Sequence, residues 1–115
     1  MNGKSLYDFY EKVLLPQFGI RDVQVEWSAS EKVGPDENVH YFTTDSVDYA
    51  LIFEDAGGLG STEAFVKEKV KLKNNSFKYV NPTSNSEYAP SYPIKFSTPY
   101  QYCTNVTGMF TLIKL

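Results

Sequence analysis

Five lysines stand close together in the second half of the chain and are the first candidates for a charged binding surface. They are Lys67, Lys69, Lys71, Lys73 and Lys78. The first four occupy every second position, with apolar residues between most of them. A period of two is typical of a strand and would turn these ammonium groups to one side. Asn74 and Asn75 favour a tight turn, after which residues 76–80 would return as the partner strand. We therefore predict a lysine-rich hairpin over 66–80.

A lysine face of this kind fits three roles. It would attract phosphate or nucleic acid, attract an acidic protein surface, or stay solvated and prevent unwanted strand pairing. Arg21 is the only arginine, and proteins that read bases usually rely on the forked guanidinium group. The sequence pI is about 5.1 and the net charge is −3, which also disfavours nucleic acid. We expect a solvated face first and an acidic protein partner second.

Aromatic residues form the second candidate site. The chain has 16% aromatic residues, and four of its tyrosines fall within fifteen residues of a proline-broken stretch. These are Tyr88, Tyr92, Tyr100 and Tyr102. Exposed tyrosines are enriched at protein interfaces and sugar-binding faces, although they would also cover the ends of a small β-core. The stretch is predicted to be a partner- or ligand-binding surface, to which Trp27 would contribute in a ligand site.

Catalytic and metal chemistry have few residues to draw on. The chain has one histidine, His40, and one cysteine, Cys103. His40 would act as a general base only with an orienting carboxylate and a nearby nucleophile, and no motif of that kind is present. The carboxylates lack the spacing of a calcium loop. We predict no catalytic residue, no metal site and no cofactor, and keep an enzyme that pairs His40 with a carboxylate as a third alternative.

The elements that must position these residues are one helix and several strands. Ser5 and Asp8 match a capping box, and the apolar residues of 5–15 recur at helical spacing up to Pro16. Alternating or continuous apolar residues predict strands, whereas 29–38 is expected to be a polar loop. The predicted strands are 23–28, 39–43, 47–54, 66–73, 76–80, 94–97, 100–104 and 109–115. The fold class is therefore α+β: an N-terminal amphipathic helix packed on a mainly antiparallel, curved sheet or partly open β-barrel.

Length and composition complete the expectation. The 115 residues suffice for one core, so we expect a single domain over 1–115. No apolar run is long enough for a membrane helix, no signal peptide is visible, and a lone cysteine suits a reducing compartment, which predicts a cytoplasmic protein. The first functional hypothesis is a non-enzymatic interaction module that acts through a protein partner. By analogy, small accessory or inhibitor proteins of viruses and mobile elements are built in this way. The alternative is a small-ligand or glycan-binding β-domain.

Overall fold

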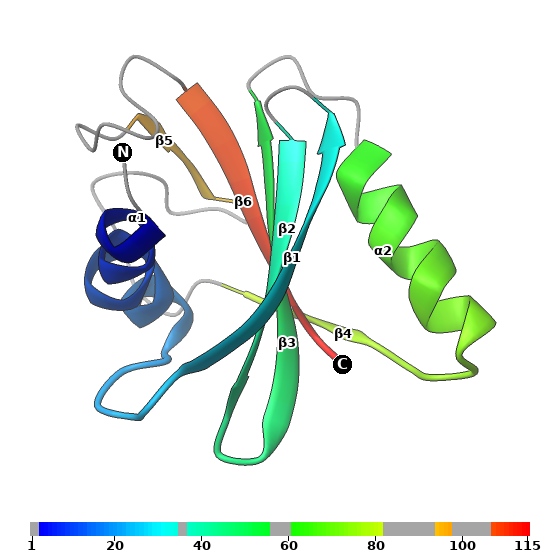
Figure 1. Cartoon of the computed structure of the whole chain (residues 1–115), viewed down its shortest axis with the longest axis horizontal. Helices are drawn as coiled ribbons and strands as arrows, with labels where there is room; N and C mark the ends of the chain where they lie inside the picture. The colour runs from blue at the N-terminus through cyan, green and yellow to red at the C-terminus, as the bar shows by residue number, and fades with distance from the viewer. Residues whose placement is uncertain (1–2, 35–36, 56–60, 82–93, 98–106) are drawn as a thin grey trace.

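The computed structural model describes residues 3–34, 37–55, 61–81, 94–97 and 107–115. It has three layers, with an N-terminal helix on one face of an antiparallel sheet and a second helix, α2 (Ser61–Leu72), on the other face (Figure 1). The sheet is curved and open, so the predicted α+β fold with an N-terminal helix on an antiparallel sheet is confirmed. The second helix was not predicted. None of the described helices is long and apolar enough to cross a membrane.

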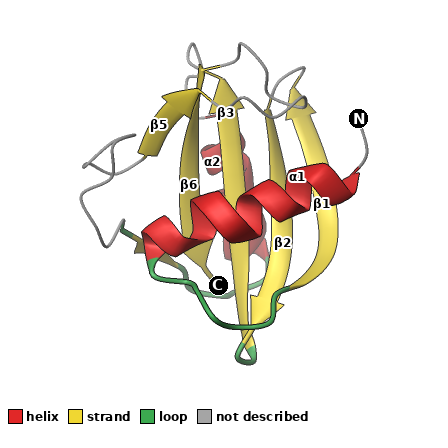
Figure 2. Cartoon of the chain, turned by 90° about the vertical axis from the view of Figure 1, so that its left-hand side faces the viewer, coloured by secondary structure: helices red, strands yellow, loops and turns green. Residues whose placement is uncertain are grey.

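The N-terminal helix lies across the strands (Figure 2), and its apolar side chains pack against them. It comprises α1 (Gly3–Phe9), a π-helical turn, η1 (Tyr10–Leu14), and a 3-10 turn, η2 (Leu15–Phe18). The predicted apolar face is confirmed, because Leu6, Phe9, Tyr10 and Leu14 are buried. The predicted start was wrong: the helix begins at Gly3, before Ser5, and Asp8 pairs with Lys12 at 2.9 Å.

The helix does not end at Pro16, as the sequence predicted, but continues through it to Phe18. The backbone N–H of Leu15 reaches back to the Tyr10 carbonyl, a π-type bond, and Pro16 then enters a 3-10 turn. Gly19 ends the helix with a φ of 84°, a left-handed conformation that glycine adopts without steric cost. The N–H groups of Gly19 and Ile20 donate to the carbonyls of Pro16 and Leu15, which is the Schellman pattern.

The sheet contains six strands in the order β1-β2-β3-β6-β4, with β5 also paired to β6. All the pairs are antiparallel. The strands are β1 (Glu26–Gly34), β2 (Glu37–Thr44), β3 (Val47–Asp55), β4 (Lys78–Val80), β5 (Ile94–Ser97) and β6 (Thr107–Lys114). β4 and β5 both lie along the edge of β6 that faces away from β3, so β3 and β6 are internal strands.

Four predicted strands match described ones closely: 39–43, 47–54, 94–97 and 109–115 correspond to β2, β3, β5 and β6. The expected polar loop over 29–38 was wrong, because β1 runs to Gly34 and pairs antiparallel with β2, with register shifts between Trp27 and Ala29 and between Lys32 and Gly34. β1 is an edge strand, and most of its residues are exposed and polar. The segment therefore lacks the alternation of apolar and polar residues by which a strand is predicted. The predicted strand 100–104 lies outside the described residues.

The sheet buries apolar side chains on both faces, because successive residues of a strand point to opposite sides. In β3, Leu51 and Phe53 belong to the cluster under the N-terminal helix, whereas Ala50 and Ile52 belong to the cluster under α2. β3 is therefore a central strand that is covered on both faces. The cluster under the N-terminal helix is the larger and holds most of the buried aromatic rings.

The predicted hairpin over 66–80 was wrong. Residues 66–72 belong to α2, and β4 pairs with β6 instead of with 66–73. Thr62, Val66 and Val70 follow helical spacing and form the buried stripe of α2 against the sheet. The turn expected at Asn74 exists, with a φ of 58°, but it ends a helix. The N–H groups of Asn74 and Asn75 donate to carbonyls of the last helical turn, again in the Schellman pattern.

Candidate functional site

The helical course of 61–72 separates the lysines that the sequence placed on one face. Residues two apart on a helix differ by about 200° in direction, whereas residues four apart nearly align. Lys67 and Lys71 therefore lie on the side of α2 that faces β4, and Lys69 and Lys73 lie on the side that faces β1. The predicted single cationic face does not exist, and Lys78 is exposed on β4, across from Lys114.

On the β4 side, Lys67 belongs to a surface cluster with two aromatic rings. The Lys67 ammonium lies 5.3 Å from the ring centre of Tyr79 and 5.7 Å from that of Phe77. It also lies 3.8 Å from the Glu63 carboxylate, which accepts a hydrogen bond from the Tyr79 hydroxyl. The hydrogen bond with Tyr79 and the charge of Glu63 raise the pKa of Lys67. The charges of Lys67 and Glu63 therefore compensate each other within the cluster. We interpret this cluster as a structural contact between α2 and β4.

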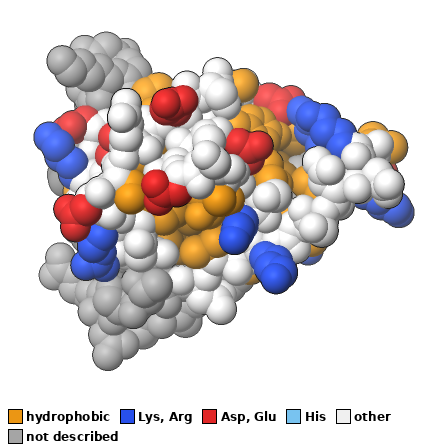
Figure 3. All heavy atoms as spheres, turned by 90° about the horizontal axis from the view of Figure 1, so that it is seen from below, with side chains coloured by type: hydrophobic (Ala, Val, Ile, Leu, Met, Phe, Trp, Pro, Cys, Tyr) orange, Lys and Arg blue, Asp and Glu red, His pale blue; other side chains and the backbone are white. Residues whose placement is uncertain are grey.

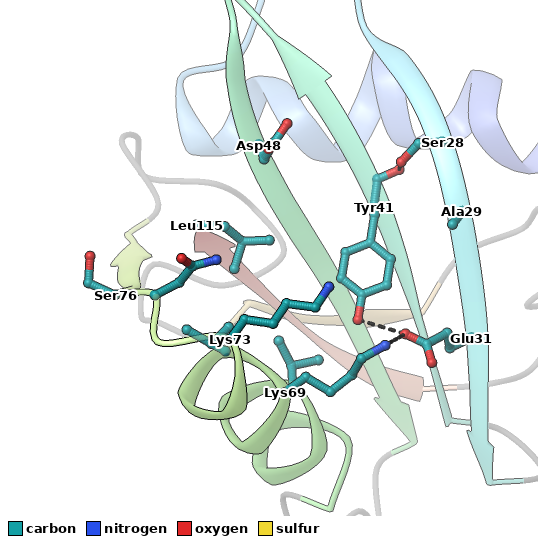
Figure 4. A pocket seen from close by; sticks show the side chains of 12 residues that line it. Ser28, Ala29, Glu31, Tyr41, Asp48, Lys69, Lys73, Ser76 and Leu115 are labelled. Atoms are coloured by element: carbon teal, nitrogen blue, oxygen red, sulfur yellow. Dashed lines mark hydrogen bonds and ion pairs between the residues drawn. The ribbon is translucent and has the colours of Figure 1, made fainter.

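On the β1 side, α2 and the sheet border a cleft of about 690 Å³. Strands β1, β2 and β3 and the end of β6 contribute its floor, and α2 with the segment after it forms one wall (Figure 4). The lining residues are Ser28, Ala29, Glu31, Tyr41, Asp48, Val66, Lys69, Val70, Lys73, Asn75, Ser76 and Leu115. We take this cleft as the candidate site.

The cleft forms because only part of α2 touches the sheet. Val66 and Val70 hold the helix on Val39, Ala50 and Ile52, but beyond Val70 the helix has no further buried residue. Leu72 is 78% exposed. The cleft lies toward the end of the sheet that carries the β2–β3 turn, and hydrophobic side chains reach the surface on this side of the molecule (Figure 3).

The polar side of the cleft is organised around Glu31. Its Oε1 accepts hydrogen bonds from Lys69 Nζ at 2.5 Å and from the Tyr41 hydroxyl at 2.9 Å. The Lys69 hydrogen bond is the largest cause that lowers the pKa of Glu31, and the charge of Lys73 adds to it. Burial, together with Glu31, raises the pKa of Tyr41. The cleft therefore holds a hydrogen-bonded network of Glu31, Tyr41 and Lys69, and Lys73 and Asp48 are the other charged residues of its lining.

Trp27 is on the opposite face of the sheet from the cleft. Its ring stacks on Tyr7 at 4.7 Å between centroids, and its Nε1–H donates to Glu11 at 2.8 Å. These contacts attach the N-terminal helix to β1. The four tyrosines that the sequence singled out, Tyr88, Tyr92, Tyr100 and Tyr102, lie outside the described residues, as does Cys103.

His40 also lies on the face under the N-terminal helix, and it is 6% exposed. The rings of Tyr7, Tyr10 and Trp27 surround it at 5.3 to 6.3 Å between centroids. Its Nδ1 lies 3.4 Å from the Tyr7 hydroxyl, and its Nε2 has no hydrogen-bond partner among the described residues. Burial lowers the pKa of His40 to about 4, so the ring is neutral at pH 7. No carboxylate of the described chain hydrogen-bonds to it.

In the part of the chain that the structure describes, no three His, Cys, Asp or Glu side chains lie close enough together to hold a metal ion. Comparison with known proteins adds no assignment: the chain matches no protein-family model, no curated protein and no solved structure.

Sequence reasoning missed the cleft because its residues come from segments far apart in the chain. Glu31, Tyr41 and Leu115 meet only when β1, β2 and β6 join one sheet. One available signal was the pair Glu63 and Lys67, whose spacing of four favours a helix and argues against a strand over this segment.

Proposed function

We propose that this protein is a non-catalytic binding module that takes a small amphipathic ligand in the cleft between α2 and the sheet. The single observation that carries the proposal is the cleft itself, whose volume of about 690 Å³ suits a small organic molecule. The proposal takes up the ligand-binding alternative from the sequence and gives it a location.

The lining supports an amphipathic ligand because it combines apolar and charged groups. Ala29, Leu115 and the ring of Tyr41 offer apolar surface on the sheet side, and Lys69 and Lys73 bring charge from α2 and its end. Ligand sites combine a mainly apolar surface with a few polar groups that fix orientation. An apolar body would displace water from Leu115 and the Tyr41 ring while a polar head group stays near the lysines.

The other face of the sheet offers less room for a ligand. The N-terminal helix fills it with buried rings, among them Phe9, Tyr10, Phe42 and Phe110. Binding through a protein partner remains a prediction, because the tyrosines that motivated it lie outside the described residues. No carboxylate of the described residues hydrogen-bonds to His40, so the ring lacks the orienting partner that a histidine general base would need.

The proposal is tested by NMR with four probes that share an eight-carbon chain: octanoate, 1-octanol, octylamine and octyl glucoside. Amide signals of the ¹⁵N-labelled protein are followed as each probe is added below its micelle concentration. We expect at least one probe to shift the signals of cleft residues such as Ala29, Val70 and Leu115 in a saturable way. Trp27 fluorescence is a poor reporter here, because the indole lies on the opposite face.

A matched pair of variants locates the binding. Ala29→Phe places a ring inside the cleft, whereas Ser30→Phe places the same ring on the same strand but on the other face, since Ser30 pairs with His40. Binding should be lost in the first variant and kept in the second. Probes that shift no cleft signals, or that bind Ala29→Phe as well as the unaltered protein, would refute the proposed function.

A further inference from the structure

We infer that the ligand of the cleft is an organic monoanion, such as a carboxylate with an apolar tail, and that Lys73 pairs with its charged head group. This inference rests on the proposed function and names the class of ligand and the residue that selects it. It follows from how the charges of the cleft are distributed.

The two lysines of the cleft differ in their partners. Lys69 already has an ion-pair partner: its Nζ lies 2.5 Å from Glu31 Oε1 and 5.7 Å from the ring centre of Tyr41. Glu31 in turn accepts the Tyr41 hydroxyl, so the three groups form one closed network that links α2 to β1 and β2. The positive charge of Lys69 and the negative charge of Glu31 cancel within this network.

Lys73 has no ion pair with any described residue, and its side chain extends into the cleft toward Tyr41 (Figure 4). Its charge acts on Glu31 from a distance, since it contributes to the lowered pKa of that carboxyl. Lys73 therefore brings an ammonium group with three donors, and without an ion pair of its own, to a cleft that also exposes apolar surface of Leu115 and of the Tyr41 ring. A bound carboxylate would supply the missing acceptor.

Asp48 is the second carboxylate of the lining, and it is the group that could favour a cation instead. It lies on β3, and its Oδ1 accepts the hydroxyl of Thr43 at 2.6 Å. Figure 4 places its carboxylate at the far end of the cleft and pointing away from Lys69 and Lys73. The head group near the lysines therefore meets one unpaired positive charge, which one negative charge neutralises.

The test compares octanoate, 1-octanol and octylamine, which differ only in the head group, in dilute buffer where screening is weak. We expect octanoate to bind about fivefold tighter than octanol, the effect of an ion pair at a partly open site. Octylamine should bind weakest. The octanoate preference should disappear in Lys73→Gln and persist in Lys71→Gln, a matched control because Lys71 lies two residues away on the other side of α2.

The outcomes separate this inference from the proposed function. If octanol or octylamine binds the cleft at least as tightly as octanoate, or if Lys73→Gln keeps the octanoate preference, the inference is wrong and the binding function stands. If none of the probes reaches the cleft, both fail. Circular dichroism of each variant verifies that the fold is intact, which is expected because Lys71 and Lys73 are both exposed.

Discussion

His40 should make the stability of this protein depend on pH between neutrality and about pH 4. The ring is buried among Tyr7, Tyr10 and Trp27, and burial disfavours its charged form. The folded pKa of about 4 lies below the ordinary value of 6.5, so the unfolded chain binds the proton more readily. The stabilisation is therefore complete above pH 6.5 and is lost as the pH falls through 6.5 toward 4.

The size of the effect follows from the difference between the two pKa values. A difference of about 2.5 units, at about 1.4 kcal/mol per unit, corresponds to roughly 3 kcal/mol of unfolding free energy by pH 4. The figure needs no large reduction for solvent screening, because His40 is only 6% exposed. For a domain of this size that loss is a substantial fraction of a total of roughly 5 to 15 kcal/mol.

The assay is urea unfolding at a series of pH values from about 7 to about 4.5, for the unaltered chain and for His40→Gln. Trp27 serves as the fluorescent reporter, since it contacts the same helix and the same histidine. Carboxylates titrate in both proteins, so the difference between the two stabilities isolates His40. We expect the unaltered chain to lose about 2 to 3 kcal/mol relative to the variant over this range. Parallel losses in the two proteins would show that the histidine is not held neutral by burial.

Three further predictions test other parts of the structure. Glu31→Gln should release Lys69 from its ion pair and strengthen octanoate binding several-fold in the titration above, because the cleft gains a net positive charge; unchanged or weaker binding would contradict the charge assignment. Asn74→Ala should lower the unfolding free energy by about 1 kcal/mol while Asn74→Gly should not, since φ is 58° there; equal effects in urea melts would argue against the helix end described. Leu51→Ala should cost about 2 to 5 kcal/mol and Leu72→Ala under about 0.5 kcal/mol, because the first is fully buried and the second is 78% exposed; similar melting temperatures would contradict the core.

Segment 66–73 shows why a local pattern can predict the wrong element. Lysine at every second position fits a strand, but on a helix the same residues fall into two stripes four apart, each solvent-accessible. Val66 and Val70 fit either element, since a spacing of four is even and also close to one helical turn. The choice depends on what the segment covers. Val39, Ala50 and Ile52 form an apolar face of the sheet, and Val66 and Val70 of α2 cover it.

The candidate site was less predictable than the fold. Its charged network needs Glu31 from an edge strand, Tyr41 from the neighbouring strand and Lys69 from a helix, and no spacing in the chain relates these three residues. The sequence did identify Lys69 and Lys73 as candidates, although for a surface on a hairpin that does not form. It gave no reason to separate Lys73 from the other lysines, because that difference lies in the acceptors each ammonium group reaches.

By itself, the sequence determined the elements whose burial pattern is local: the apolar face of the N-terminal helix, the internal strands β2, β3 and β6, and the turn between β2 and β3, where Asp45 and Ser46 adopt positive φ. Each follows from a period of 3.6 or 2, or from turn residues, within a dozen positions. Tertiary structure alone decided that 61–72 is a helix, that β4 pairs with β6, and that a cleft remains beside Lys73. These outcomes depend on which apolar surfaces are left uncovered once the sheet has formed, and burying such surfaces is a property of the whole chain.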